Sequence, residues 1–342
     1  MRLPTPRGPL GAALMTALVS DPGAPAEISE TLVNRALMAS DPLSDDDLHL
    51  TLWVMYELHY RGFDDVDAAW EWDPGVLRTR RAIETVFEQA LRAAAASSVT
   101  AALEAGEDLV GQIEHVIDSV PGVDLARFVQ REATSEQVLE LLAQRSVYTL
   151  KESDPSSFVL PRIDGGAKTA LAELLYDEYG AGRPERLHSR LYAEGMQACG
   201  LDPAYGGYVD QVPGHVLATN NAASFFGLHR RLRGSALGHL AAFEATSSLP
   251  CRRFAAGIRR LGLPDEMWHY FDEHVEADAV HEQVALSDIC GRLVTDEPEL
   301  RADVLFGAVV CQQLEAASAR HTLQAWQAGH SCLFSTADAV PA

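Results

Sequence analysis

The sequence predicts an all-α protein, because three observations agree. Apolar residues recur with the period of a helix along most of the 342 residues, and convincing strand-like alternation is absent. Prolines and capping residues stand where these periodic segments begin. Hydrophobic residues make up 47% of the chain, which is enough for a full core, so we expect a folded helical protein and not a disordered one.

The first half of the chain begins with a proline-rich start and a short apolar run. Leu10, Leu14 and Leu18 recur at helical spacing, which favours a retained amphipathic helix over a signal peptide of similar length. Further helices are predicted over 44–60, 74–97 and about 134–152. Thr134 and Gln137 have the spacing of a capping box and mark the start of the last of these.

The second half is also helical in pattern, with helices predicted over 168–179, 184–198, 212–246 (long or broken), from Pro264 onward, and 298–329. Glycines and a proline interrupt the pattern at 180–184, and periodicity weakens at 121–133, where we expect a linker. We therefore predict an N-terminal helical region over 1–135, a second helical domain over 136–334 and a loose tail over 335–342.

Charge and cysteine content restrict the partners. The net charge of −22 argues against nucleic acid and against an anionic membrane surface, and no apolar run reaches the length of a membrane span, about 20 residues. The five cysteines are scattered and form no CxxC pair, as in a reducing compartment. We expect a cytoplasmic protein that acts on a small molecule.

One short segment carries most of the functional information. His274, Asp278 and His281 are separated by four and three residues, so a helix places them on one face, within an arc of roughly 60°. Apolar neighbours suggest that this helix is buried, and buried ionisable groups need partners such as a metal ion. The alternative is a solvated polar face.

Matching donors occur on other predicted helices. Glu178 ends one helix and His188 begins the next, and the break between them allows both to face one centre. Glu244 follows an apolar stretch, which suggests a buried carboxylate that is protonated, paired with an arginine or bound to metal. His239 lies on another face and is interpreted as a structural or supporting histidine.

Together these side chains make three carboxylates and three imidazoles: Glu178, His188, Glu244, His274, Asp278 and His281. Oxygen and nitrogen donors in this ratio suit two iron or manganese ions inside a helical bundle. Zinc is less favoured, because catalytic zinc usually takes three protein ligands and structural zinc often uses cysteine.

The residues resemble a known family. The stretches 144–154, 177–188, 238–244 and 274–281 are similar to those of the haem-oxygenase-like diiron oxidases and oxygenases, in the group described as actinobacterial iron-containing redox enzymes, and the similarity covers 136–330. The family's ligand pattern falls on the six donors given above. Some members recruit further carboxylates, for which Glu152 and Glu185 are the candidates.

The resemblance implies a haem-oxygenase-like helical bundle with an N-terminal helical extension. It also implies a non-haem Fe(II) pair that uses O2 as co-substrate to oxidise an amino-acid-, amine- or fatty-acid-derived substrate. The alternatives on the same fold are a metal- or haem-handling protein and a thiaminase-like hydrolase, although no cysteine stands beside the donors in sequence. Tyr192, one turn after His188, is expected to pack in the core rather than to act in redox chemistry.

The region 1–135 has no ligand pattern of its own. Glu57 and His59 are two residues apart and point to different sides of a helix, so they are interpreted as packing or hydrogen-bonding residues. We expect this region to pack as extra helices against the metal-binding bundle and to help form a homodimer or cover the substrate.

Overall fold

The computed structural model describes residues 1–22, 28–39, 41–106 and 108–335, without the side chains of 39 and 276–280. Within these residues there is no strand, which confirms the all-α prediction. The N-terminal helices are α1 (Pro9–Leu18), α2 (Glu30–Ala39), α3 (Asp46–Glu57), α4 (Pro74–Glu104), α5 (Leu109–Ser119) and α6 (Leu125–Arg131). The remainder are α7 (Ser135–Thr149), α8 (Asp154–Ser157), α9 (Gly165–Glu178), α10 (His188–Ala198), α11 (Gly214–Leu228), α12 (Arg233–Arg260), α13 (Asp265–Gln283), α14 (Arg292–Asp296) and α15 (Arg301–Gln327).

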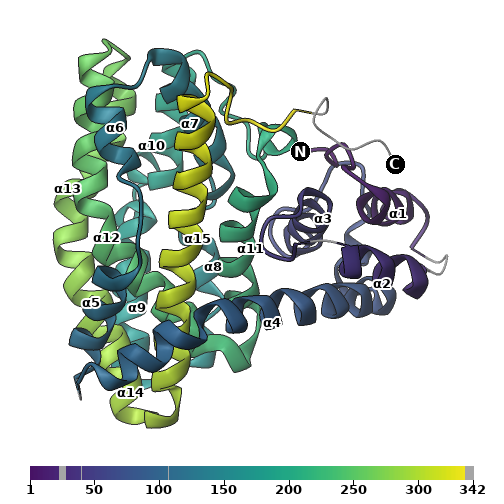
Figure 1. Ribbon diagram of the computed structural model, residues 1–342, viewed down its shortest axis with the longest axis horizontal. Coiled ribbons are helices and arrows are strands. Elements are labelled where there is room, and N and C mark those ends of the chain that lie inside the picture. The colour runs from purple at the N-terminus through teal and green to yellow at the C-terminus, as the bar shows by residue number, and fades with distance from the viewer. Residues whose placement is uncertain (23–27, 40, 107, 336–342) are drawn as a thin grey trace.

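The largest body of the molecule is a helical bundle around α12. This helix packs along both α13 and α15, and α7, α9, α10 and α11 complete the bundle (Figure 1). The close approach of α12 and α15 depends on two glycines, Gly238 and Gly307. A Cβ on either one would collide with a backbone carbonyl oxygen of the facing helix, so a side chain at either position would force the two helices apart.

A smaller group of helices stands beside the bundle. Figure 1 shows α1, α2 and α3 together on one side, with the long helix α4 running from them to the bundle. α3 packs on α11, and α4 packs on α15. Leu10, Leu14 and Leu18 of α1 are fully buried, as expected for the core face of an amphipathic helix.

Helix starts follow the expected chemistry in several places. The Thr134 hydroxyl accepts from the Gln137 amide N–H, and the Gln137 side chain accepts from the Thr134 amide, so the predicted capping box is present at the start of α7. Asp73 caps α4 ahead of its first-turn proline. The helix predicted over 212–246 as either long or broken is broken, between Leu228 and Arg233.

Three sequence predictions need correction. The expected linker at 121–133 contains α6, a short helix that packs on α12 and is capped by Asp124. Its seven residues are too few for a periodic pattern to stand out. The helix expected from 184 begins only at His188, because Pro184–Arg186 forms a separate 3-10 turn. The helix expected to continue to about 152 ends at Thr149.

After α13 the chain continues as a π-helix, η7 (Val284–Gly291), before α14. Most of the expected tail, 336–342, lies outside the described residues, and the boundary at 135 stays a prediction. Across the residues described, no helix is both long and apolar enough to cross a bilayer.

Candidate metal centre

Five of the six predicted donors, together with Glu152, come from five places in the chain. Glu152 follows the end of α7, Glu178 is the last residue of α9 and His188 the first of α10; Glu244 lies on α12, and His274 and His281 lie on α13. α7 contacts α10, α10 contacts α13 and α13 contacts α12, while α9 packs against η7, the continuation of α13. Residues far apart in sequence therefore meet on the inside of the fold.

Two backbone features direct the donors inward. Ser153 has a left-handed conformation with φ of 69°, which turns the chain directly after Glu152. Between α9 and α10, Gly180, Ala181 and Gly182 all have positive φ. This tight reversal brings His188 back beside Glu178, and it explains why glycines stand at that point of the sequence.

The first group of donors consists of Glu152, Glu178, His188 and His274, each of which offers one ligand atom within 4.8 Å of the others. His188 Nδ1 lies 3.1 Å from Glu178 Oε2, and His274 Nε2 lies 3.6 Å from Glu152 Oε2. The two imidazole rings are 4.5 Å apart between centroids. Four donors at these separations can surround a single cation.

The second group consists of Glu178, Glu244 and His281, again with ligand atoms within 4.8 Å of one another. His281 Nδ1 lies 3.3 Å from Glu178 Oε1 and 3.7 Å from Glu244 Oε2. Glu178 thus faces the first group with Oε2 and the second with Oε1. One carboxylate between two donor groups is an arrangement that can bridge two ions.

A hydrogen bond orients the imidazole of His274. His274 Nδ1 lies 2.7 Å from the Tyr270 carbonyl oxygen and donates to it in the tautomer that leaves Nε2 facing Glu152. His281 Nε2 lies 3.7 Å from the half-exposed Asp177 carboxylate, while Nδ1 faces the second group. An outer partner that fixes one ring nitrogen and frees the other is typical of metal-binding histidines.

The donor set fits a metal. Three buried imidazole nitrogens that face the two groups, His188 Nδ1, His274 Nε2 and His281 Nδ1, have no hydrogen-bond partner among the described residues. Among the described residues, every ion pair of Glu152 and Glu178 is with one of these histidines. Buried nitrogen lone pairs and buried carboxylates both gain from a cation.

The charges of the cluster shift its pKa values strongly. Burial disfavours the charged imidazoles, yet the Glu152 and Glu178 carboxylates raise the pKa of His274 to about 10. Against the same effect of burial, Glu178 and Glu244 raise the pKa of His281 to about 10. Burial also opposes ionisation of Glu178, but His188 and His281 lower its pKa well below the usual range. Without a metal, protons therefore balance the carboxylates.

The remaining predicted residues lie elsewhere or outside the described part. The side chain of Asp278 is not among those described, although the backbone of α13 spans it. Glu185 is exposed on the turn before α10 and belongs to neither group. His239 is buried on α12 and belongs to neither group. Tyr192 is buried and donates to the Leu142 carbonyl oxygen.

Two of the side chains that touch the cluster were not singled out in the sequence. The Tyr270 hydroxyl donates to Glu152 at 3.0 Å, and the Ser153 hydroxyl donates to Glu178 Oε2 at 3.2 Å. Tyr270 stands four residues before His274, so helical spacing gave a usable signal for it. Ser153 reaches Glu178 only through a turn that the sequence does not reveal.

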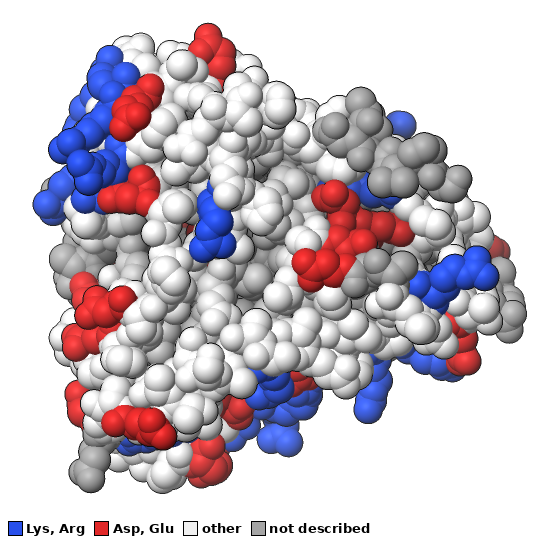
Figure 2. Space-filling model, in the orientation of Figure 1, with Lys and Arg blue, Asp and Glu red and all other residues white. Residues whose placement is uncertain are grey.

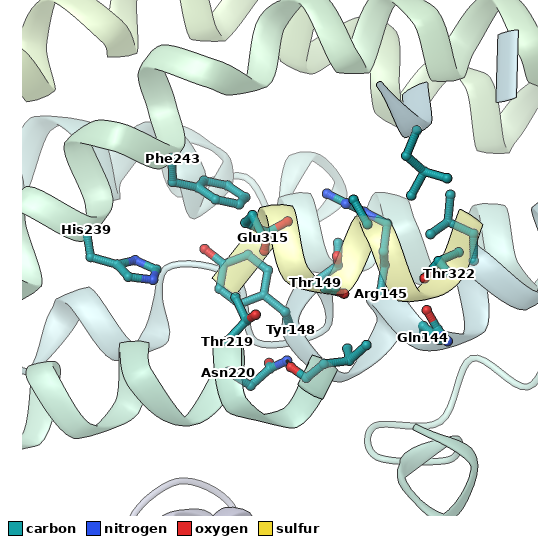
Figure 3. Close-up of a pocket in the computed structure, with 15 residues that line it drawn as sticks. Gln144, Arg145, Tyr148, Thr149, Thr219, Asn220, His239, Phe243, Glu315 and Thr322 are labelled. Atoms are coloured by element: carbon teal, nitrogen blue, oxygen red, sulfur yellow. Dashed lines mark hydrogen bonds between the residues drawn. The ribbon is translucent and has the colours of Figure 1, made fainter. Parts of the chain in front are cut away.

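A cavity lies beside the cluster, between α7, α11, α12 and α15. It has a volume of about 70 Å³. Figure 3 shows polar side chains along its length, from His239 at one end to Gln144 and Thr322 at the other. Two residues of its wall, Tyr148 and Phe243, adjoin the cluster. Phe243 directly precedes Glu244 in the sequence. Burial raises the pKa of Tyr148, and the charges of Glu152, Glu244 and Glu178 raise it further.

The sequence comparisons agree with this geometry. A family model described as "iron-containing redox enzyme" matches residues 139–316, more than half of the chain, and this span contains every described member of both donor groups. No curated protein matches the chain closely enough to serve as a relative. The chain therefore belongs to the iron-containing redox enzyme family, with the all-α, haem-oxygenase-like fold that the resemblance implied.

Proposed function

We propose that the protein is a non-haem diiron oxidase or oxygenase that uses O2 to oxidise a small organic substrate. The observation that carries this proposal is the shared carboxylate: Glu178 faces two separate donor groups with its two oxygens. Carboxylates and imidazoles projecting into a helical bundle suit iron or manganese. A bound pair of Fe(II) ions would supply the electrons for reaction with O2.

In this proposal Glu152, His188 and His274 would hold one ion, Glu244 and His281 would hold the other, and Glu178 would contribute to both. Asp278 remains a proposed ligand on the strength of its sequence position alone. The Tyr270 hydroxyl holds Glu152 in place, and its carbonyl oxygen holds the His274 ring. Tyr148 and Phe243 line the cavity that would receive the substrate.

The thiaminase-like alternative is disfavoured by the cysteines. A nucleophilic cysteine needs a lowered pKa. Burial raises the pKa of Cys199 to about 11 and of Cys290 to about 12, and it raises those of Cys311 and Cys332 as well. Among the described residues none of the five cysteines forms a disulfide, which supports the proposed cytoplasmic location.

The partners follow from the charge. On the face in Figure 2, acidic and basic side chains form small separate patches and much of the surface is uncharged. With a net charge of −22, this supports a small-molecule substrate and neither nucleic acid nor membrane as partner. The homodimer stays a prediction.

The first test is anaerobic reconstitution of the metal-free protein with Fe(II), followed by iron counting and O2 uptake on admission of air. We expect two ions per chain and rapid O2 consumption. His281→Ala should lose one ion, whereas His269→Ala, an exposed histidine on the same helix, should lose none. Iron binding without O2 consumption would favour a metal-handling protein instead.

The bridging role of Glu178 has its own test. Glu178→Gln should reduce the bound iron more than Glu152→Gln or Glu244→Gln does, because only Glu178 belongs to both groups. Glu185→Gln, on the exposed turn after α9, is the matched control and should retain both ions. Full iron occupancy in Glu178→Gln would contradict the proposed centre.

A further inference from the structure

Three side chains in the wall of the cavity between α7, α11, α12 and α15 have buried polar atoms that nothing satisfies. Thr219 Oγ1, Asn220 Oδ1 and His239 Nε2 have no hydrogen-bond partner among the residues that the structure describes. Asn220 is only 4% exposed and His239 only 7%. Figure 3 shows Thr219 and Asn220 entering the cavity from α11, with His239 of α12 at one end. Because buried polar atoms are normally hydrogen-bonded, three in one cavity indicate that something binds there.

The amide of Asn220 is held in one orientation. Its Nδ2 donates to the Val216 carbonyl oxygen at 3.1 Å. The reverse orientation would place Oδ1 against that carbonyl oxygen, where two acceptors repel each other. The unpartnered atom is therefore the amide oxygen, which can only accept. A ligand group that satisfies it must carry an N–H or an O–H.

Thr219 differs from other threonines inside the helices. The hydroxyls of Thr85, Thr100 and Thr246 each donate to the carbonyl oxygen four residues earlier in their own helix. This bond is the usual way in which a helical threonine is satisfied. Thr219 makes no such bond within the described part of the chain, and its hydroxyl lies in the cavity wall instead. It can therefore donate one hydrogen bond to a ligand.

None of these three side chains carries a charge near pH 7. Burial lowers the pKa of His239 to about 4, so its imidazole is neutral. The charged residues of the wall, Arg145 and Glu315, also line an outer groove of about 240 Å³, which Thr219, Asn220 and His239 do not line. A carboxylate cannot donate to Asn220 Oδ1, and an ammonium group beside it would lose its hydration among neutral atoms.

We propose that Thr219 and Asn220 form a subsite for an uncharged ligand group that both donates and accepts hydrogen bonds, a primary carboxamide or a hydroxyl. Its N–H or O–H would donate to Asn220 Oδ1, and its oxygen would accept from the Thr219 hydroxyl. His239 Nε2 would serve a further polar atom of the ligand. The cavity volume of about 70 Å³ is several times the roughly 10–15 Å³ that one water needs, so it can hold such a group.

This subsite adds a selectivity that the family resemblance does not imply, because free amino acids, amines and fatty acids are charged near pH 7. It selects for a neutral group and against the carboxylate and ammonium groups of those compounds. The inference rests on the proposed function only in naming the ligand as the substrate. The subsite itself consists of residues outside both donor groups of the metal centre.

The test compares compounds of one size that differ in a single group. One set is butyramide, 1-butanol, butyrate and butylamine, and the other is benzamide, benzyl alcohol, benzoate and benzylamine. Calorimetric titration of the full metal-free chain measures each affinity, so that iron does not attract the acid or the amine. In at least one set we expect the amide or the alcohol to bind about tenfold or more tightly than the acid and the amine. The tighter of the two identifies the group as a carboxamide or a hydroxyl.

Variants then assign the preference to the subsite. Asn220→Leu and Thr219→Val should each weaken binding of the preferred neutral probe about tenfold, because each removes one hydrogen bond. Thr246→Val is the matched control, since its hydroxyl bonds within its own helix and the residue does not line the cavity. It should leave every affinity unchanged. Circular dichroism and melting temperature identify any variant that fails to fold, in which case Asn220→Ser and Thr219→Ala replace the pair and should also weaken binding.

The inference is overturned if no probe binds the wild type, if the acid or the amine binds as tightly as the neutral probes in both sets, or if the subsite variants behave like Thr246→Val. Its failure is distinguishable from failure of the proposed function, because iron counting and O2 uptake do not depend on these probes. Selective binding of a neutral probe by a protein that holds no iron would keep the subsite and reject the diiron centre.

Discussion

Two adjacent residues, Lys151 and Glu152, take their charges into different surroundings. Lys151 Nζ lies 2.5 Å from Glu57 Oε1, and Tyr205 donates to the other oxygen of Glu57. Glu152 instead enters a cluster of carboxylates and imidazoles with several nitrogens left unsatisfied. The first arrangement is complete within the protein, whereas the second requires protons or metal ions. Burial of charge alone does not mark a functional site; incomplete pairing does.

The comparison predicts the largest effect at the complete pair. Lys151 and Glu57 are both fully buried. Lys151→Met should therefore lower the free energy of unfolding by about 3–5 kcal/mol, because the buried Glu57 carboxylate loses its partner. The double variant Lys151→Met with Glu57→Met should recover most of this loss. Urea unfolding of the metal-free proteins measures both. A single variant as stable as the wild type would show that the pair is not the closed unit described here.

Metal addition should affect only the incomplete cluster. Fe(II) at about 100 times its dissociation constant should stabilise the folded protein by about 2.7 kcal/mol per site. Lys151→Met should keep this increment on its lower baseline, since its site is intact, and His281→Ala should lose part of it. Anaerobic thermal unfolding with and without Fe(II) supplies the measurement. An equal increment in all three proteins would place the metal elsewhere.

Tyr270 and Tyr192 form an aromatic pair, but only one of them is expected to support the metal centre. Tyr270 and Tyr192 rings are 4.8 Å apart, but only Tyr270 donates to Glu152. Tyr270→Phe should weaken metal binding by about 10- to 100-fold, as loss of an outer partner does. Tyr192→Phe should cost about 1 kcal/mol of stability and leave metal affinity unchanged. Titration with Mn(II) compares them, and equal affinities would remove Tyr270 from the metal centre.

The smallest effect expected is a pH dependence of the metal-free fold. The carboxylates raise the pKa of His274 and His281 from 6.5 to about 10. Protonation therefore stabilises the metal-free fold fully below pH 6.5, and this contribution is lost as the pH rises towards 10. We expect a loss of about 1 kcal/mol or more over this range, reduced in His281→Ala. Melting temperatures across the range would contradict the account if the two proteins changed in parallel.

The sequence predicted most of the fold because helix boundaries have local causes. The Thr134 capping box and the proline after Asp73 begin helices where expected. The helix α6 was missed because seven residues give too short a pattern. The π-helix after Gln283 was also not foreseen, since its wider hydrogen-bond spacing leaves no mark in the hydrophobic period.

For the candidate site, donors on one helix could be predicted from their spacing, whereas donors from different helices depend on how the helices pack. His274 and His281 were found from their positions on one helix face, and Tyr270 lies on the same face one turn earlier. Glu152 was only a secondary candidate, because its approach to Glu178 depends on how α7 packs.

The most direct test of the central claim is an anomalous-scattering map from crystals grown with Mn(II). The account predicts two manganese peaks per chain, one beside Glu152, His188 and His274 and the other beside Glu244 and His281, with Glu178 between them. A single peak, or peaks away from Glu178, would contradict it.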